Sequence, residues 1–452
     1  MSSSERILEW FKERFGIKSV DSILRPIPNF SFRPDYWLGS LLVLGFVMQG
    51  ITGFLLLLYY VPTPEQAWSS THAIVTSVPY GSLLLTFHLY DAYAIILIAF
   101  LHMFRNFFVG SYKRPREGMW FYGVILGLIT LGFGFTGYLL PWTVVSKSAT
   151  DVGVGMLNYF PTWLTGWLKS ILVGNGTDAA ELTRFFAMHV ILLPLLLALF
   201  LFLKLYTFEA HGIAPPPYQS KDVEVTRSTS WIPGGVLYLT MIGMFYIGGL
   251  LIVSSLFPAA LPPAYSVQAA MSITPEPDWY FLWIYQILKL SIFGGPNVIY
   301  ALTLISLLFV VLFLVPIIDM RGGRKPSERP VIFTLGMIVA TSVVFLTVWA
   351  YLTPGQTIPF YEAVLYIGGI AAIEGLAAYF GLRRGSMKSV RADQSTAKVH
   401  PSVAMMVLTT SIAGASASLV LLEKGYLISI LLIIGFIYAS MASIKKMERV
   451  RS

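Results

Sequence analysis

The chain has 452 residues, of which 56% are hydrophobic and only 12% are charged, with a net charge of +8. This balance lies far outside that of soluble domains and indicates an all-α polytopic membrane protein. The chain contains no cysteine, which excludes disulfides, thiol catalysis and iron–sulfur ligation by the chain itself. The positive charge is attributed to cytoplasmic loops and lipid headgroups, and no nucleic-acid partner is expected.

The first segment, residues 1 to 30, is predicted to form a short helix that lies on the membrane surface. Its apolar side chains fall near one helical face: Ile7, Leu8, Trp10, Phe11 and Phe15. Charged residues are spread through its first twenty positions, so no cleavable signal peptide is expected.

Ten apolar stretches that follow are long enough to cross a bilayer as helices. They cover about residues 37 to 60, 84 to 107, 119 to 140, 185 to 207, 233 to 257, 298 to 318, 331 to 352, 361 to 382, 402 to 422 and 426 to 443. Lys and Arg gather at both termini and in alternate loops, whereas the loops at 61 to 83 and 353 to 360 contain none. The positive-inside rule therefore predicts a multi-pass protein of the cell membrane with both termini in the cytoplasm.

The second and fourth predicted spans carry candidate metal ligands at matching depths. His88 and His102 are fourteen residues apart, and His189 and Lys204 are fifteen apart, which corresponds to about 21 to 22 Å along a helix. Because both spans run from outside to inside, His88 shares the outer level with His189, and His102 shares the inner level with Lys204. The topology thus predicts two stacked metal sites.

The first and third predicted spans carry glycines with the same spacing. Gly39 and Gly53 are fourteen residues apart, and so are Gly123 and Gly137. A haem with two axial ligands needs both ligands at one depth, and small residues where its ring lies against a neighbouring helix. The repeated spacing favours this interpretation over ordinary close packing of helices.

With these residues in place, the chain resembles cytochrome b of the cytochrome bc and plastid-type quinol-oxidising complexes, including archaeal-type or oxidase-associated variants. The similarity covers about residues 30 to 352 and rests on the segments GSLLVLGFVMQGITG, FLHMFRNF, KRPREGMW, GFTGYLLPW, RFFAMHVILLP and PDWYF. The resemblance implies a four-helix bundle that holds two haems, b-type or modified. It places the outer haem on His88 and His189, and the inner haem on His102 and Lys204.

The resemblance also suggests a division of the chain. After the surface helix, the parts are a di-haem bundle at 31 to 215, a C-terminal cytochrome b part at 216 to 382 with the PDWY loop, a basic linker at 383 to 401, and two additional helices with a tail at 402 to 452.

Two residues near the ligands depart from the family pattern. Lys204 replaces the last histidine, and a lysine binds iron only as the neutral amine, so burial and iron must remove its proton. Alternatively, Lys204 extends to the cytoplasmic surface and leaves the inner haem five-coordinate or absent. Leu85 stands where the family has an arginine that pairs with a haem propionate. Asp91, three residues after His88, is either a proton-handling group or a polar contact between helices.

The PDWYF segment at 277 to 281 resembles the PEWY signature of the outer quinol site. Asp278 replaces the glutamate and is expected to accept a proton from quinol, although a loop carboxylate can also cap a helix. Glu276 is the alternative acceptor. The resemblance assigns three tyrosines to the pocket: Tyr138, Tyr280 and Tyr285.

Partners are implied by the same resemblance. Residues 143 to 153 match the short surface helices on which a Rieske iron–sulfur protein docks. Cytochrome c or oxidase subunits, and a dimer within a larger complex, are also expected. Glu209 falls where many relatives have a histidine that contacts quinone at the inner site.

The resulting hypothesis is a membrane oxidoreductase subunit that is active only with its partners. It takes electrons from quinol at the outer site and passes them through two haems across the membrane, coupled to proton translocation. One alternative is a cytochrome b that feeds a terminal oxidase in a fused assembly. A non-enzymatic alternative is a haem-free transporter or scaffold, which would show no haem absorbance.

Overall fold

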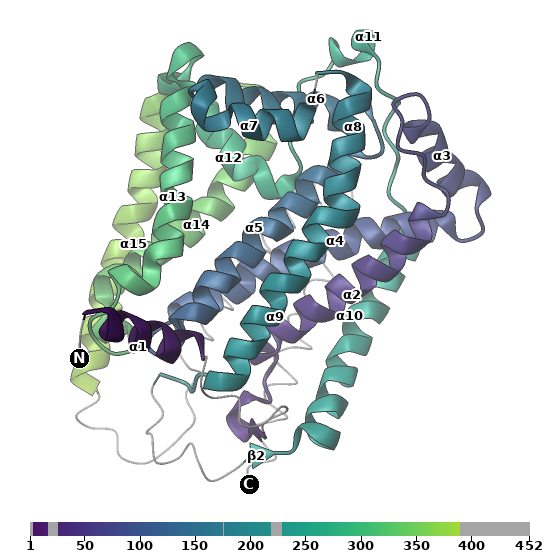
Figure 1. Ribbon diagram of the computed structural model, residues 1–452. Coiled ribbons are helices and arrows are strands. Elements are labelled where there is room, and N and C mark those ends of the chain that lie inside the picture. The colour runs from purple at the N-terminus through teal and green to yellow at the C-terminus, as the bar shows by residue number, and fades with distance from the viewer. Residues whose placement is uncertain (1–2, 17–25, 175, 218–227, 389–452) are drawn as a thin grey trace. The chain divides into compact units, whose positions relative to one another are not determined.

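The structure is a computed structural model that describes residues 3–16, 26–174, 176–217 and 228–388, and these are mostly helical (Figure 1). The helices are α1 (Ser3–Phe15), α2 (Leu38–Leu57), α3 (Ala67–Ser77), α4 (Gly81–Phe108), α5 (Glu117–Leu139), α6 (Val144–Gly155), α7 (Thr162–Val173), α8 (Asp178–Ala187), α9 (Leu193–His211), α10 (Val236–Leu256), α11 (Val267–Ala270), α12 (Leu282–Leu288), α13 (Val298–Ile318), α14 (Pro330–Leu352) and α15 (Phe360–Lys388). Two short strands, β1 (Ile27–Pro28) and β2 (Ser228–Thr229), pair antiparallel with Ile27 opposite Thr229.

Seven helices in the described part of the chain are long and apolar enough to cross a membrane. They are Leu38–Leu57, Gly81–Phe108, Glu117–Leu139, Asp178–His211, Trp231–Leu256, Gly295–Ile318 and Pro330–Leu352. They coincide with the first seven predicted spans, which confirms a helical polytopic membrane protein. Helix α15 forms at the eighth predicted span. The last two predicted spans and the linker beyond residue 388 lie outside the described residues.

The described chain divides into two compact units. Of the described residues, the first unit contains those up to Asp278 and Ile292–Lys325, and the second contains Trp279–Ser291 and those from Pro326 onward. In the first unit, α2 packs against α4, α5 packs against both α4 and α9, and α10 and α13 flank α4 and α5 respectively (Figure 1). In the second unit, α14 packs against both α12 and α15. The first unit therefore contains the four-helix arrangement that the ligand spacing requires.

Large apolar side chains point outward from the spanning helices of the first unit. Phe202 is 65% exposed, Met244 71% and Phe245 75%. In a soluble protein such a surface would be unstable in water, whereas lipid chains solvate it without cost. The internal backbone hydrogen bonds of each helix satisfy the polar groups that the bilayer cannot.

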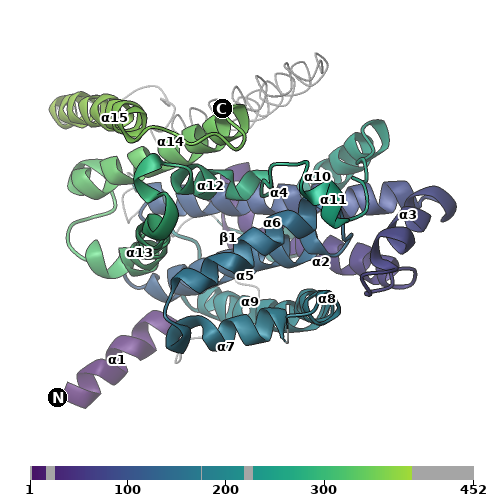
Figure 2. The ribbon, with the colours of Figure 1, turned by 90° about the horizontal axis from the view of Figure 1, so that it is seen from above.

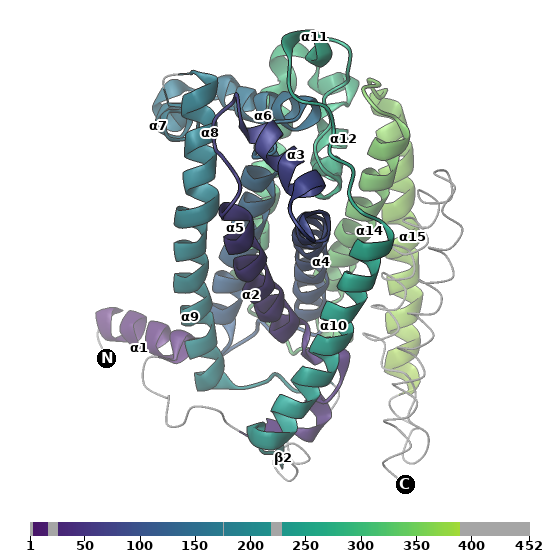
Figure 3. The same ribbon diagram turned by 90° about the vertical axis from the view of Figure 1, so that its right-hand side faces the viewer.

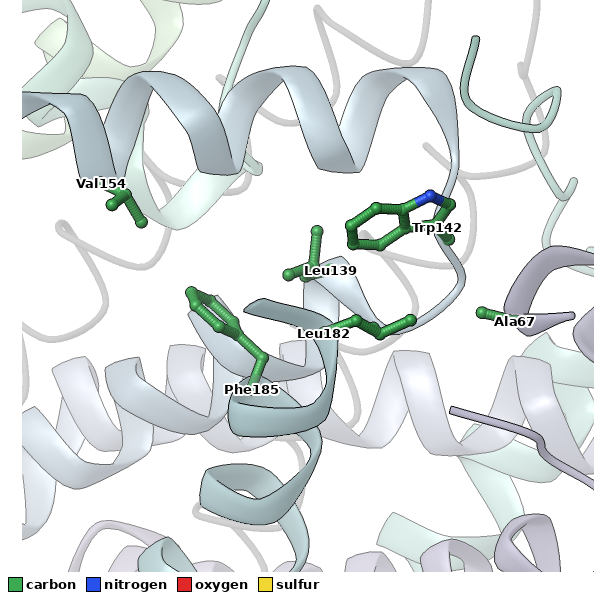
Figure 4. Close-up of a cluster of buried hydrophobic side chains, with 6 residues drawn as sticks. All are labelled: Ala67, Leu139, Trp142, Val154, Leu182 and Phe185. Atoms are coloured by element: carbon green, nitrogen blue, oxygen red, sulfur yellow. The ribbon is translucent and has the colours of Figure 1, made fainter. Parts of the chain in front are cut away.

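One end of the bundle is closed by a cluster of buried apolar side chains (Figure 4). Helices α6 and α7 lie across the ends of the long helices there (Figures 1 and 2). The cluster joins α3, α5, α6 and α8 and consists of Ala67, Leu139, Trp142, Val154, Leu182 and Phe185. Because Phe185 precedes His189 by one helical turn, this packing fixes the helix end that carries a predicted ligand.

Helix α1 runs across the direction of α9 (Figure 3). Ile7, Leu8 and Phe11 are exposed on it, while Arg14 forms a buried ion pair with Glu117 of α5 at 3.0 Å. The helix is thus anchored to the bundle at its C-terminal end, and its apolar residues remain open to lipid.

Candidate functional site

The two outer histidines face two glycines across the bundle. His88 of α4 faces Gly53 of α2, where a Cβ atom would lie 3.3 Å from the histidine Cε1. His189, in the turn between α8 and α9, faces Gly137 of α5, where a Cβ atom would lie 2.6 Å from its Cε1. His189 also lies within electrostatic range of His88. The structure thus brings the predicted outer pair together, and each glycine, having no side chain, makes room for the imidazole that faces it.

Each outer imidazole is oriented by a threonine that the sequence analysis missed. The hydroxyl oxygen of Thr52 lies 2.8 Å from Nδ1 of His88, and that of Thr136 lies 3.1 Å from Nδ1 of His189. Each hydroxyl also lies 2.8 Å from the backbone carbonyl four residues earlier, and when it donates its single hydrogen there it can accept the hydrogen on Nδ1. Nε2 then carries the lone pair, which is the form in which a histidine binds a metal.

The sequence contains a pattern from which these two threonines could have been identified. In both helices a threonine directly precedes the outer glycine, as Thr52–Gly53 and Thr136–Gly137. Adjacent positions on a helix differ by about 100° in direction, so the glycine can open space beside the imidazole while the threonine reaches its edge.

The inner pair is built differently. His102 of α4 faces Gly39 of α2, and the side-chain nitrogen Nζ of Lys204 lies against Gly123 of α5; in both cases an added Cβ would lie 3.3 Å from the side chain. Lys204 lies within electrostatic range of His102. The Nε2 of His102 lies 3.0 Å from the Asn106 amide nitrogen, and its buried Nδ1 has no hydrogen-bond partner among the described residues.

The unequal ligand spacings are reconciled by the geometry of the fourth helix. The turn Met188–Leu192 is π-helical and holds one more residue than an α-helical turn. Pro194 follows it at the start of α9 and has no N–H to give to the carbonyl of Val190. The fifteen residues from His189 to Lys204 therefore cover about the same depth as the fourteen from His88 to His102.

These features fit a haem at each level. Glycines present no side chain that would block a flat ring at either level, and the buried Nδ1 of His102, which has no hydrogen-bond partner among the described residues, marks a group whose partner would come from outside the chain.

Asp91 contributes a polar contact between three helices. Its two carboxylate oxygens accept hydrogen bonds from Tyr246 of α10 at 2.5 Å and from Gln49 of α2 at 3.0 Å. Gln49 also donates to the backbone carbonyl of His88 at 2.7 Å. Neither Gln49 nor Tyr246 was expected from the sequence, since one apolar span does not reveal what the next one presents to it.

The predicted quinol-site residues divide between the two units. In the first unit, Tyr138 lies within electrostatic range of both Asp278 and Glu276, and Tyr93 of α4 donates a hydrogen bond to Asp278 at 2.8 Å. In the second unit, Tyr280 is buried beside the ring of Phe281, and the ring of Tyr285 lies below the ammonium of Lys289 at 4.9 Å.

The predicted docking segment forms α6, which begins after a capping box made by Thr143 and Ser146. Lys147 is buried there and forms ion pairs with Asp151, Asp178 and Glu181. Burial acts to lower the pKa of Lys147, but the neighbouring carboxylates outweigh it and raise the pKa above its ordinary value.

At the other end of the bundle, Glu209 lies in α9 and its Oε2 is buried without a hydrogen-bond partner among the described residues. Its assignment to an inner quinone site stays a prediction.

Comparison with known proteins matches these features to one family. The model described as cytochrome b (N-terminal)/b6/petB matches residues 93–264, and the one described as cytochrome b (C-terminal)/b6/petD matches residues 263–370. Cytochrome b of Sulfolobus acidocaldarius is 33% identical over 423 residues, covering 87% of this chain and 74% of the relative. The cytochrome bc complex cytochrome b subunit of Chlorobaculum thiosulfatiphilum is 33% identical over 357 residues, covering 77% of this chain and 82% of the relative.

Two further likenesses bear on the bundle and on the fold. Cytochrome b6 of Heliobacterium mobile is 37% identical over 214 residues, which cover 46% of this chain and all of the relative. A solved structure titled hyperthermophilic respiratory Complex III has the same fold, with a TM-score of 0.62 at 24% identity, covering 83% of this chain and 97% of the other. The chain belongs to the cytochrome b family, a family of haem-binding membrane proteins of electron transport.

Proposed function

We propose that this chain is the cytochrome b subunit of a quinol-oxidising respiratory complex and that it holds two haems. The observation that carries the proposal is the matched geometry at two levels, where His88 and His189, and then His102 and Lys204, each face a glycine on a neighbouring helix. The printed name of the Chlorobaculum relative, a subunit of a cytochrome bc complex, supports the same assignment.

The chain's own residues would prepare the outer site. Thr52 and Thr136 hold both imidazoles with Nε2 available, and Gln49 ties the backbone of His88 to Asp91. Haem at these positions would supply reversible one-electron chemistry. The protein then sets ligand orientation, burial and the distance between the two levels.

At the quinol site, the carboxylates of Asp278 and Glu276 would accept protons. Oxidation of one quinol to quinone releases two electrons and two protons. The iron–sulfur cluster of a Rieske partner would take one electron, and the haem pair would take the other. One proton passes to the carboxylate of Asp278 and the other to Glu276 or water, and both leave on the outer side.

The position in the cell follows from the charge pattern. The alternate loops rich in Lys and Arg favour cytoplasmic termini, with Asp278 toward the outer face of the plasma membrane. A Rieske protein would dock near α6, cytochrome c or oxidase subunits would accept the electron, and the chain would form a dimer within the larger complex.

Lys204 provides the test of the inner haem. In the purified complex we expect about two haems per chain by absorbance, one per ligand pair. Lys204→Ala should make the inner haem five-coordinate and high-spin, and Lys204→His should give it a spectrum typical of two histidine ligands with a shifted midpoint potential. The outer haem, with His88 and His189 unchanged, serves as the internal control.

If neither substitution changes the spectrum or the midpoint potential of any haem, Lys204 is not a ligand. If the wild-type complex contains no haem at all, the whole proposal fails in favour of a haem-free membrane protein.

A further inference from the structure

Helix α4 uses two opposite faces for two different purposes. Thr86, Tyr90 and Tyr93 follow one another at positions i, i+4 and i+7, so they lie on one face. His88 lies about 200° from Thr86 around the helix and faces α2 instead. The helix therefore carries a ligand on one face and three polar side chains on the other.

All three polar side chains bind the segment that leads from α10 to the PDWYF motif. Thr86 accepts a hydrogen bond from the backbone N–H of Ala259 at 3.0 Å. Tyr90 donates to the backbone carbonyl of Phe257 at 2.7 Å, and Tyr93 donates to the carboxylate of Asp278 at 2.8 Å. The first two contacts are made to backbone atoms. Tyr93 instead contacts the Asp278 side chain, which takes part in the proposed reaction.

The contact from Tyr93 is suited to fixing an orientation. Tyr93 is half-buried and its ring stacks on that of Tyr90, with 6.4 Å between centroids. It belongs to a long helix, so its hydroxyl position is set by a rigid element and not by the loop that carries Asp278. A hydrogen bond to a carboxylate is also shorter and stronger than one between neutral groups.

The short side chain of Asp278 makes the hydrogen bond from Tyr93 important. Asp278 stands where the resemblance expects glutamate, and its side chain is shorter by one carbon–carbon bond of about 1.5 Å. A proton acceptor must lie within hydrogen-bond reach of the hydroxyl that it deprotonates. With less reach of its own, the aspartate depends more on what holds its carboxylate in place.

We propose that Tyr93 is a positioning residue for quinol oxidation, holding the carboxylate of Asp278 in the orientation in which it accepts the quinol proton. The proposal rests on the proposed function and adds to it a residue outside the PDWYF motif. Tyr93 acts through Asp278 and exchanges no electron with quinol.

The test uses membranes that contain the whole complex and a synthetic short-chain quinol as probe. The rate of quinol-driven haem reduction is measured by stopped-flow absorbance over a range of quinol concentrations, for Tyr93→Phe and for the matched control Tyr90→Phe. Both changes remove one hydroxyl from the same helix face and leave the ring in place. The same measurement is made for Asp278→Ala and for Asp278→Ala combined with Tyr93→Phe.

We expect Tyr93→Phe to lower kcat roughly tenfold with little change in KM, because the acceptor is misplaced while quinol still binds. Tyr90→Phe should stay within about twofold of wild type, and haem content should be equal in all variants. In the Asp278→Ala background, Tyr93→Phe should change kcat by less than about twofold, since residues that act as a unit are not additive.

Three other results would count against the proposal. If Asp278→Ala slows haem reduction but Tyr93→Phe does not differ from Tyr90→Phe, the positioning role is wrong and the quinol site stands. If the effects of Tyr93→Phe and Asp278→Ala are additive, Tyr93 does not act through Asp278. If Asp278→Ala leaves the rate unchanged, the proposed quinol site itself fails.

Discussion

At the scale of single residues, the outer ligand pair owes its order to the hydroxyls of Thr52 and Thr136. Each hydroxyl lies 2.8 Å from a backbone carbonyl in its own helix, and when it donates there it accepts the hydrogen of the imidazole. Two neighbours of the same kind thus select the same tautomer for both histidines. Such outer contacts are nearly as important to a metal site as the ligands themselves.

Replacing these threonines with valine should therefore disturb the outer haem alone. Valine keeps the shape but removes the acceptor, so we expect Thr52→Val or Thr136→Val to weaken retention of that haem roughly tenfold and to raise its midpoint potential, because the imidazole donates less charge. The measurement is a redox titration followed by absorbance.

Thr130→Val is the matched control for both variants. Thr130 is buried in α5 and donates to the carbonyl of Leu126 at 2.7 Å, as Thr136 does to that of Gly132. Equal titration curves for Thr130→Val and Thr136→Val would show that the contact to His189 has no role in setting the potential.

At this scale the candidate ligands could be predicted from the sequence, but the residues that orient them by hydrogen bonds could not. The histidines and glycines stand out because one spacing recurs in three spans. Thr52 and His88 are 36 residues apart, and Tyr93 and Asp278 are 185 apart, so no local pattern links them. Hydropathy indicates how deep a residue lies in the membrane, whereas these contacts depend on how each helix is rotated about its axis.

At the scale of elements, α6 is held to α8 by a buried cation. Lys147 and Glu181 each retain only 5% of their side-chain exposure and lie 3.2 Å apart, and Asp151 and Asp178 complete the set around the lysine. Removing one member of a buried pair leaves a charge without compensation, which costs more than losing the attraction alone.

Lys147→Met should consequently destabilise this end of the bundle by about 3 to 5 kcal/mol, measured by thermal unfolding of the purified protein. Lys169→Met is the control, because Lys169 is exposed on α7 and its loss should cost less than about 0.5 kcal/mol. Similar melting curves for the two variants would contradict a structural role for the buried cluster.

The same cluster predicts a pH dependence. Because the folded-state pKa of Lys147 is raised, its contribution is complete below the ordinary pKa of lysine and is lost as the pH rises through the raised value. The difference in melting temperature between wild type and Lys147→Met should thus persist at neutral pH and shrink only in strong alkali.

At the scale of the whole molecule, the apolar runs were sufficient to locate the spanning helices. Each of the first seven predicted spans coincides with a helix, because a bilayer leaves a long apolar segment no alternative to internal hydrogen bonding. Irregular features were not predictable in this way. The π-helical turn at Met188–Leu192 lies just before Pro194 within an apolar run, and hydropathy alone does not reveal it.

The orientation in the membrane can be tested because the chain contains no cysteine. A single cysteine at Gln268, in the predicted outer loop, should react with a membrane-impermeant thiol reagent added to intact cells. One at Ser327, in a predicted cytoplasmic loop, should react only after permeabilisation. Both positions are exposed, so the reverse pattern would mean that the chain is inserted the other way round.

The ligands and the glycines that face them lie on different helices of the bundle. This arrangement also determines when each site can form during synthesis of the chain. Every candidate ligand lies in α4 or in the α8–α9 helix, and every glycine that faces one lies in α2 or α5. Neither level is complete until the fourth helix has left the ribosome and entered the bilayer. Cofactor insertion must then follow translation past Lys204, and both levels become available in the same step of biogenesis.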